Sequence, residues 1–255
     1  MKTVALDDLP SRGKLIPKDK YPQLNIQRLS LKQMQLFSTA VSKSSPEAFV
    51  EAIRTSVNVP LNYLTVGDFY YVVTYLRCSL RTPLSLSWTC DGFWYHTKDN
   101  QERISAPDAK RLMMDPEFKD QTLVPVSCGT DNTQVYRLDD IPVVYLPEQE
   151  IVLGEDFEIP NATLLPEYMR LVKDHNMAQL LPGLQWVKHG RTLKEKLEWV
   201  AAQGERDVDI LDEGDQYNHD YAHGPSNMLI AECRCCKTAV RQRISLGAES
   251  FFRQT

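Results

Sequence analysis

Hydrophobic residues show no regular spacing before Ser30 and a helical spacing after it. Residues 1–29 mix prolines with scattered apolar side chains, so we predict an extended N-terminal arm that orders on a partner's surface. From Ser30 the apolar positions recur every three or four residues, which predicts a helical region over residues 30–81. Pro46 and Thr65 stand at positions typical of helix starts, so three helices are expected in this region.

The third of these helices is apolar on nearly all sides between Phe69 and Leu76. A helix of this kind is buried on more than one face. Its aromatic residues also suit a subunit that buries surface against its neighbours, where large aromatic side chains contribute most of the binding energy.

The pattern changes to alternation in the middle of the chain and then returns to helical spacing. Residues 82–153 are predicted to form a β region with a polar insert over residues 94–122. Residues 154–204 again show helical spacing, and residues 205–255 are predicted to be a C-terminal Cys-x-x-Cys β-ribbon that packs on the 82–153 region. The predicted fold class is therefore α+β, with a helical N-terminal part and a small β module of zinc-ribbon type.

Composition narrows the functional classes. The chain has 255 residues, 42% hydrophobic and 25% charged, as is usual for a globular protein, and its net charge is -5. This charge argues against broad, charge-driven binding to nucleic acid or anionic membranes. No apolar stretch approaches the roughly 20 residues that cross a bilayer, and the acidic Asp7 and Asp8 argue against a signal peptide.

Cysteines provide the clearest chemical signal. Cys233 and Cys236 form a Cys-x-x-Cys pair, the spacing at which two thiolates on a tight turn bind one tetrahedral metal ion. Cys90 and Cys128 each follow a short apolar run that reads as a strand, and each lies close to a glycine. In a reducing compartment such cysteines are thiols or metal ligands, so we predict a zinc site formed by these four residues.

Several alternatives to this ligand set stay open. The four cysteines could be buried, unreactive thiols, and the gap between Cys90 and Cys128 is long for a ligand pair. Either Cys235 or His96 could replace one of the proposed ligands. An iron–sulfur cluster fits the same four cysteines, although no ferredoxin-like run of cysteines supports it.

No catalytic constellation is evident, and we predict that the protein is not an enzyme. His219 and His223 have i, i+4 spacing, but Gly224 and Pro225 follow, so a polar loop is the better interpretation. The acidic residues near Asp139 and between 205 and 220 fit no calcium loop and are expected to form a solvated face. There is also no Gly-x-Ser-x-Gly motif.

A series of motifs occurs in a distinctive order along the chain. They are Thr65-Val66-Gly67-Asp68-Phe69-Tyr70-Tyr71, Trp88-Thr89-Cys90, Cys128-Gly129, the run Leu138-Asp139-Asp140-Ile141-Pro142-Val143-Val144-Tyr145-Leu146-Pro147, His223-Gly224-Pro225, the Cys-x-x-Cys pair and Phe251-Phe252-Arg253. In this order the chain resembles the T-even-type baseplate hub family of contractile-tailed bacteriophages. The resemblance covers roughly residues 60–255 in separated motifs. The family places the second cysteine close behind the first, so residues 91–127 are a departure from its pattern.

The resemblance implies a non-catalytic structural or assembly subunit of a phage tail baseplate, in the hub region. It implies binding to other tail proteins through the arm and apolar surfaces, with possible oligomerisation in the baseplate and no nucleic acid. It also implies a host cytoplasmic location during assembly and a possible place in the virion tail. The alternative from the residues alone is a zinc-ribbon regulator that binds nucleic acid, for which Arg234, Lys237, Arg241 and Arg243 would supply the basic patch.

Overall fold

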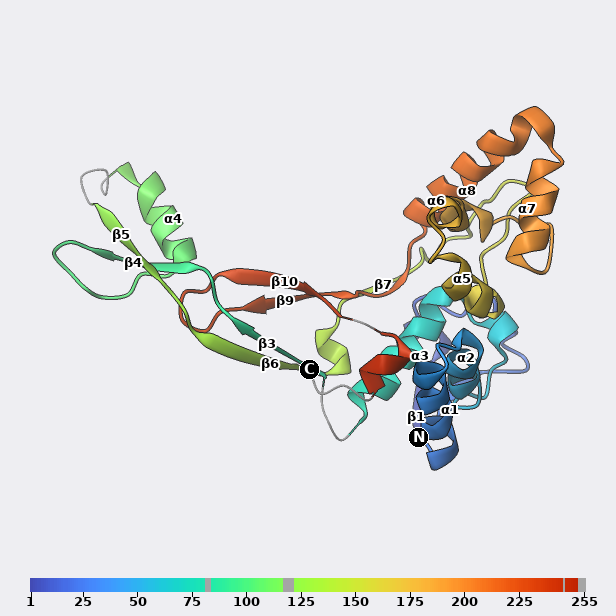
Figure 1. Cartoon of the computed structure of the whole chain (residues 1–255), viewed down its shortest axis with the longest axis horizontal. Coiled ribbons are helices and arrows are strands. Elements are labelled where there is room, and N and C mark those ends of the chain that lie inside the picture. The colour runs from blue at the N-terminus through green and yellow to red at the C-terminus, as the bar shows by residue number, and fades with distance from the viewer. Residues whose placement is uncertain (81–83, 117–121, 245, 252–255) are drawn as a thin grey trace. The chain divides into compact units, whose positions relative to one another are not determined.

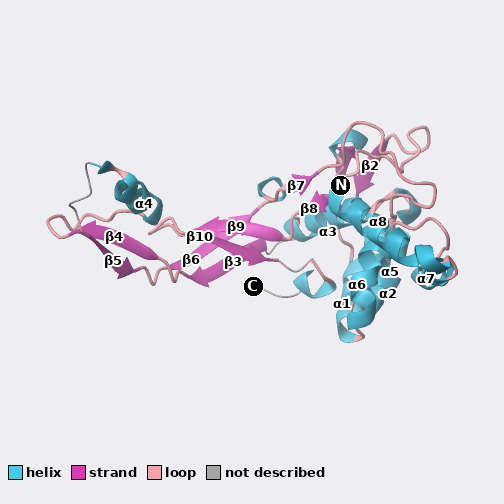
Figure 2. Ribbon diagram, turned by 90° about the horizontal axis from the view of Figure 1, so that it is seen from above, coloured by secondary structure: helices cyan, strands magenta, loops and turns pink. Residues whose placement is uncertain are grey.

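The computed structural model of the protein describes residues 1–80, 84–116, 122–244 and 246–251. The chain folds into two compact units. We call the described parts of residues 1–80, 141–226 and 246–251 the helical unit, and those of 84–140 and 227–244 the ribbon unit. Helices combined with small antiparallel sheets confirm the predicted α+β class (Figures 1 and 2).

The helical unit takes its elements from both ends of the chain and from its middle. Its α-helices are α1 (Leu31–Ser42), α2 (Pro46–Arg54), α3 (Val66–Cys78), α5 (Leu165–Leu171), α6 (His175–Leu184), α7 (Leu193–Ala201) and α8 (Asp207–Asp220). Two short antiparallel pairs accompany them, β1 (Lys2–Ala5) with β2 (Gln23–Ile26) and β7 (Val143–Val144) with β8 (Gly224–Pro225).

Helices α1, α2 and α3 begin where side chains satisfy their first backbone N–H groups. The hydroxyls of Ser30, Ser45 and Thr65 each accept from the amide three residues later. Gln33 and Asp68 return the contact to the backbone of Ser30 and Thr65, which completes two capping boxes. The three predicted helix starts are confirmed.

Aromatic side chains from α1, α2 and α3 form the core of the N-terminal helices. The ring centroids of Phe37 and Phe49 are 5.9 Å apart, as are those of Phe49 and Phe69, and Phe251 stacks on Phe37 at 4.1 Å. Phe69 is fully buried. The apolar run of α3 therefore packs inside the helical unit, and the expectation that this helix offers a surface to neighbouring subunits is wrong.

The N-terminal segment is part of the same core and not an extended arm. Leu9 and Leu24 are fully buried, and Ile16 is 4% exposed. Strands β1 and β2 close the segment into an antiparallel pair, and its loop hydrogen-bonds to Asp68 at the start of α3. The prediction of an arm over residues 1–29 is wrong because turns, rather than a regular period, direct these side chains inward.

The acidic stretch of the predicted C-terminal ribbon is a helix of the helical unit. In α8, Ile210 is buried, Gly214 lies against α6, and Tyr217 packs on the same core. These positions share one helix face, while the carboxylates occupy the exposed face. The boundary of the region predicted over residues 205–255 is thus corrected, because the strand pair that flanks the Cys-x-x-Cys turn covers only residues 228–243.

The ribbon unit consists of three antiparallel strand pairs and one helix. They are β3 (Leu84–Thr89) with β6 (Asp131–Tyr136), β4 (Phe93–Thr97) with β5 (Leu123–Ser127), β9 (Met228–Glu232) with β10 (Ala239–Arg243), and α4 (Ala106–Met114). Figure 1 shows β9 and β10 beside β3 and β6, and α4 beside β4. The Tyr136 hydroxyl of β6 donates to the Ile230 carbonyl of β9 (3.3 Å), so the β3/β6 pair contacts the β9/β10 pair directly.

The inner faces of these pairs form a small core. Leu84 and Leu86 of β3, Tyr136 of β6, and Leu229 and Ala231 of β9 are all at most 5% exposed. Alternate positions on β9 are exposed, as the strand period requires. This packing brings the end of β9 to the end of β3, where the cysteines lie.

Candidate metal centre

The four predicted ligands come from the ends of strands in the ribbon unit. Cys90 directly follows β3, and Cys128 directly follows β5. Cys233 directly follows β9, and Cys236 lies in the turn before β10. Three strand pairs therefore contribute to the site: β3/β6 and β4/β5 provide one cysteine each, and β9/β10 provides two.

The four sulfur atoms form one buried cluster. All of them lie within 4.8 Å of one another. The Sγ atoms of Cys90 and Cys236 are 3.4 Å apart, and those of Cys128 and Cys233 are 3.6 Å apart. Cys90, Cys233 and Cys236 are buried, and Cys128 is partly exposed. The structure thus brings together all four residues that the sequence singled out.

This spacing fits one metal ion. Four thiolates at about 2.3 Å from a tetrahedral ion have sulfurs about 3.8 Å apart, within the observed range. An iron–sulfur cluster places several irons and sulfides between its cysteines, which requires wider separations. The sulfurs could therefore hold a single tetrahedral ion.

The long gap between Cys90 and Cys128 is bridged by a continuous ribbon. Backbone hydrogen bonds join Cys90 N to Thr130 O (2.9 Å), Gly129 N to Cys90 O (3.1 Å) and Cys128 N to Gly92 O (2.9 Å). Strands β3 and β6 therefore continue past the cysteines into β4 and β5. The hydrogen bonds between the two strands therefore place Cys90 and Cys128 side by side, although 37 residues separate them in the sequence.

The Cys-x-x-Cys turn is closed by its own backbone. Cys233 N donates to Thr238 O (3.0 Å), and Lys237 N donates to Cys233 O (2.9 Å). Lys237 has a φ of 60°, the left-handed conformation that lets the chain reverse here. The Cys235 amide then points at the Cys233 sulfur (3.4 Å), as in metal-binding turns.

The thiols differ in acidity according to their surroundings. Burial raises the pKa of Cys90 to about 12, and burial also raises the pKa of Cys236. Burial opposes ionisation of Cys128 too, but hydrogen bonds from Thr130 and Cys233 outweigh it and lower its pKa to about 6. At Cys233 burial is outweighed by backbone N–H groups, so its pKa is lowered. A bound cation would favour the thiolate form of all four.

The two alternative ligands lie outside the cluster. Cys235 packs beside it, but its sulfur accepts from the guanidinium of Arg103 (3.4 Å). The Nδ1 atom of His96 lies 2.8 Å from the Thr97 carbonyl oxygen, and its ring lies beside Trp94. Neither side chain belongs to the group of four.

Part of the insert is attached to the cysteine turn. The first amide of α4, at Ala106, donates to the Cys236 carbonyl (2.9 Å). The Arg103 guanidinium lies over the Trp94 ring, 5.0 Å from its centroid, as well as against Cys235. Helix α4 of the insert is thus anchored directly to the Cys-x-x-Cys turn.

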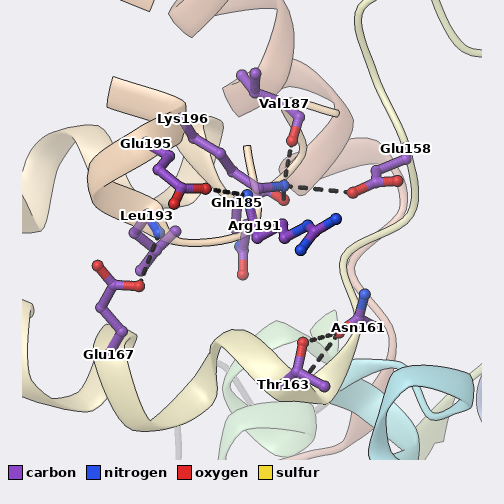
Figure 3. Close-up of polar contacts among 10 residues, drawn as sticks. All are labelled: Glu158, Asn161, Thr163, Glu167, Gln185, Val187, Arg191, Leu193, Glu195 and Lys196. Carbon is purple, nitrogen blue, oxygen red and sulfur yellow. Dashed lines mark hydrogen bonds and ion pairs between the residues drawn. The ribbon is translucent and has the colours of Figure 1, made fainter. Parts of the chain in front are cut away.

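Sequence reasoning overlooked a buried lysine, Lys196 of α7. Its Nζ contacts the carbonyl oxygens of Gln185 and Val187 and lies 3.4 Å from Glu158 Oε1 (Figure 3). Gln185 is the C-cap of α6, where a cation is stabilising, and burial lowers the lysine's pKa. Glu167 meanwhile accepts from the first amides of α7. Lys196 and Glu167 each satisfy backbone groups at a helix end, so these two charged side chains have a structural role.

A second buried polar network contains serine, histidine and aspartate but has no catalytic arrangement. The Ser11 hydroxyl donates to the fully buried Asp68 (2.6 Å), and the Thr65 amide donates to the same carboxylate (3.1 Å). His223 Nε2 lies 2.7 Å from the Thr65 hydroxyl. In a catalytic triad the serine hydroxyl would face the histidine. This network instead ties the N-terminal segment and the residues after α8 to the start of α3.

The histidine and acidic residues that the sequence offered as candidate metal ligands lie outside the cysteine cluster. Within the described residues the cysteine cluster is the group of potential metal ligands that comes together, and it contains neither His219 nor His223. Asp140 accepts from the Arg137 amide (2.7 Å), as a turn residue does. Among the helices that the structure describes, none has the length and hydrophobicity needed to cross a bilayer.

Comparison with known proteins does not identify the family. No protein-family model, no curated protein and no solved structure matches this chain. The resemblance to the phage baseplate hub family stays a prediction from its motifs, and the cysteine cluster is the feature on which function can be argued.

Proposed function

We propose that Cys90, Cys128, Cys233 and Cys236 bind one Zn²⁺ that holds the ribbon unit together. The observation that carries this proposal is the cluster itself: four sulfurs within 4.8 Å, three of them on buried residues. Such a group is costly to bury as uncompensated thiolates and is stabilised by a cation. Zinc is the metal that four cysteines at strand ends most commonly bind.

The proposed site is structural and not catalytic. Four protein ligands fill a tetrahedral coordination sphere, which leaves no position for water or substrate. The ribbon unit also has a small core, so a metal ion would supply much of its stability. Zinc binding can contribute about 10 kcal/mol or more to such a fold.

The test is the zinc content of the purified protein, combined with thermal unfolding in the presence of a chelator. We expect about one zinc per chain and a lower melting temperature after chelation. A metal-free protein that melts at the same temperature with and without chelator would contradict the proposal.

At the level of the whole protein, the proposed function is that of a structural or assembly subunit that binds other proteins. The motifs resembling the baseplate hub family make the proposed setting a phage tail baseplate assembled in the host cytoplasm. The exposed surface of the ribbon unit supports binding to other proteins independently of this resemblance. Large apolar side chains of the ribbon unit are exposed, among them Met113 (61%), Met114 (73%) and Ile230 (60%).

This proposal is testable by co-expression with the proteins of a contractile tail baseplate. We expect co-purification with at least one of them, weakened by Ile230→Ser but not by Val208→Ser, an equally exposed residue on α8. Nucleic acid binding that falls steeply with salt would instead support the regulator alternative. Against that alternative, the sequence of the ribbon unit has as many Asp and Glu as Lys and Arg residues.

A further inference from the structure

One buried polar residue, Asn132, joins the two halves of the cysteine cluster. It lies on β6 beside the Cys90 and Cys128 half and is 5% exposed. Its Nδ2 donates to the Thr130 carbonyl (2.8 Å) and lies 3.5 Å from Cys233 Sγ. Its Oδ1 accepts from the Arg234 amide (3.1 Å). A single side chain therefore connects the β6 backbone to the Cys-x-x-Cys turn.

Thr238 reaches across the cluster in the opposite direction. It follows the Cys-x-x-Cys turn, and its hydroxyl lies 3.1 Å from Cys236 Sγ. The same hydroxyl packs on Gly92, next to Cys90, so closely that a Cβ added to Gly92 would lie 2.5 Å from it. Each half of the cluster thus contributes one residue that contacts the other half.

We propose that Asn132 and Thr238 are positioning residues that set the affinity of this centre for its metal ion. The inference rests on the zinc centre proposed above. Both residues hold the two cysteine pairs at a fixed separation, and both place a hydrogen-bond donor at a sulfur. A metal-bound thiolate carries no proton and accepts such bonds, which fix its orientation.

The two residues are suited to this role because their donors are committed to the cluster. Asn132 uses its amide and its carbonyl oxygen in contacts around Cys233, with no group facing bulk solvent. Thr238 has one hydroxyl, located between a cysteine sulfur and a glycine where no larger group fits. Loss of comparable partners around metal ligands typically lowers affinity by about 10–100-fold.

Substitutions distinguish positioning from simple packing. Thr238→Val keeps the shape of the side chain and removes the donor, whereas Thr238→Ser keeps the donor. Asn132→Asp replaces Nδ2 by an oxygen, so the contacts to Cys233 Sγ and to the Thr130 carbonyl become repulsive. Thr133→Val is a matched control, because Thr133 lies on the exposed face of β6, where its hydroxyl is 3.1 Å from the Ser87 hydroxyl.

The experiment measures Zn²⁺ affinity by chelator competition and the thiolate-to-metal charge-transfer band of the Co²⁺-loaded full chain. Thr238→Val and Asn132→Asp are expected to bind Zn²⁺ about 10–100-fold more weakly, with a shifted band for Thr238→Val. Thr238→Ser and Thr133→Val are expected to match the unmodified protein. Unchanged affinity and spectrum for Thr238→Val, with one zinc still bound, would overturn this inference alone. An unmodified protein that binds no metal would overturn the zinc proposal as well.

Discussion

At the scale of single residues, the cluster holds protons that a metal must displace. Burial raises the pKa of Cys90 to about 12 and also raises that of Cys236, while hydrogen bonds lower that of Cys128 to about 6. At neutral pH the first two are thiols and Cys128 is mostly thiolate. Zinc binding therefore releases at least two protons, because thiolates are the ligands.

This ionisation predicts that zinc binds more tightly as pH rises. Each proton released contributes about a factor of ten per pH unit, so affinity should rise about a hundredfold between pH 7 and pH 8. Below pH 6 the loss should steepen, because Cys128 is then protonated too. Competition with a chelator of known pH dependence checks this. A flat affinity over pH 6–8 would contradict the assignment of protons.

Removing one ligand should be far more damaging than removing a cysteine elsewhere. Cys236→Ser should abolish stoichiometric zinc and lower the melting temperature, because three thiolates leave the coordination open. Cys78→Ser is the control, since Cys78 lies partly exposed at the end of α3 in the helical unit. Zinc content and thermal unfolding of both variants decide the matter. Equal effects of the two substitutions would show that the cluster does not hold the metal.

At the scale of elements, the N-terminal strands and their loop belong to the fold. Leu24 of β2 is fully buried, so Leu24→Ala should destabilise the protein by about 2–5 kcal/mol. Leu31→Ala serves as the control, because Leu31 is 76% exposed at the start of α1. Chemical denaturation of both variants measures the difference. If Leu24→Ala unfolds at the same denaturant concentration as the control, the segment is peripheral after all.

Elements with strong local signals were predictable from the sequence, and those that depend on distant partners were not. Helix starts at Ser30 and Thr65 follow from capping residues that act within three positions. The cysteines were predictable as a set because thiols at strand ends have few other uses. The N-terminal segment has no period, so only the tertiary structure shows that it is buried.

Helix α8 illustrates the same limit. Its many carboxylates predicted the solvated face that they form, but not the few inward positions, such as Ile210 and Gly214, on which the helix depends. Cys90 and Cys128 were predicted to share one site, but the way in which they meet was not, because it requires β4 and β5 to extend the ribbon beyond the cysteines. Donors such as Asn132 carry no sequence signal of their own.

At the scale of the whole molecule, all four proposed ligands lie in one of the two units. Metal removal should therefore loosen the ribbon unit and leave the helical unit folded. Hydrogen exchange with and without chelator checks this. Exchange should increase in residues 84–97, 123–136 and 228–243 and stay constant in α1, α6 and α8. Uniform change over both units would contradict a local metal centre.

The central claim is that four cysteine sulfurs bind one zinc ion in the ribbon unit. Zinc K-edge X-ray absorption of the purified full chain tests it most directly, because it reports the type and number of the atoms around the metal. The account predicts four sulfur neighbours at about 2.3 Å and no second metal nearby. A shell containing nitrogen or oxygen, a metal–metal distance, or a protein without zinc would contradict it.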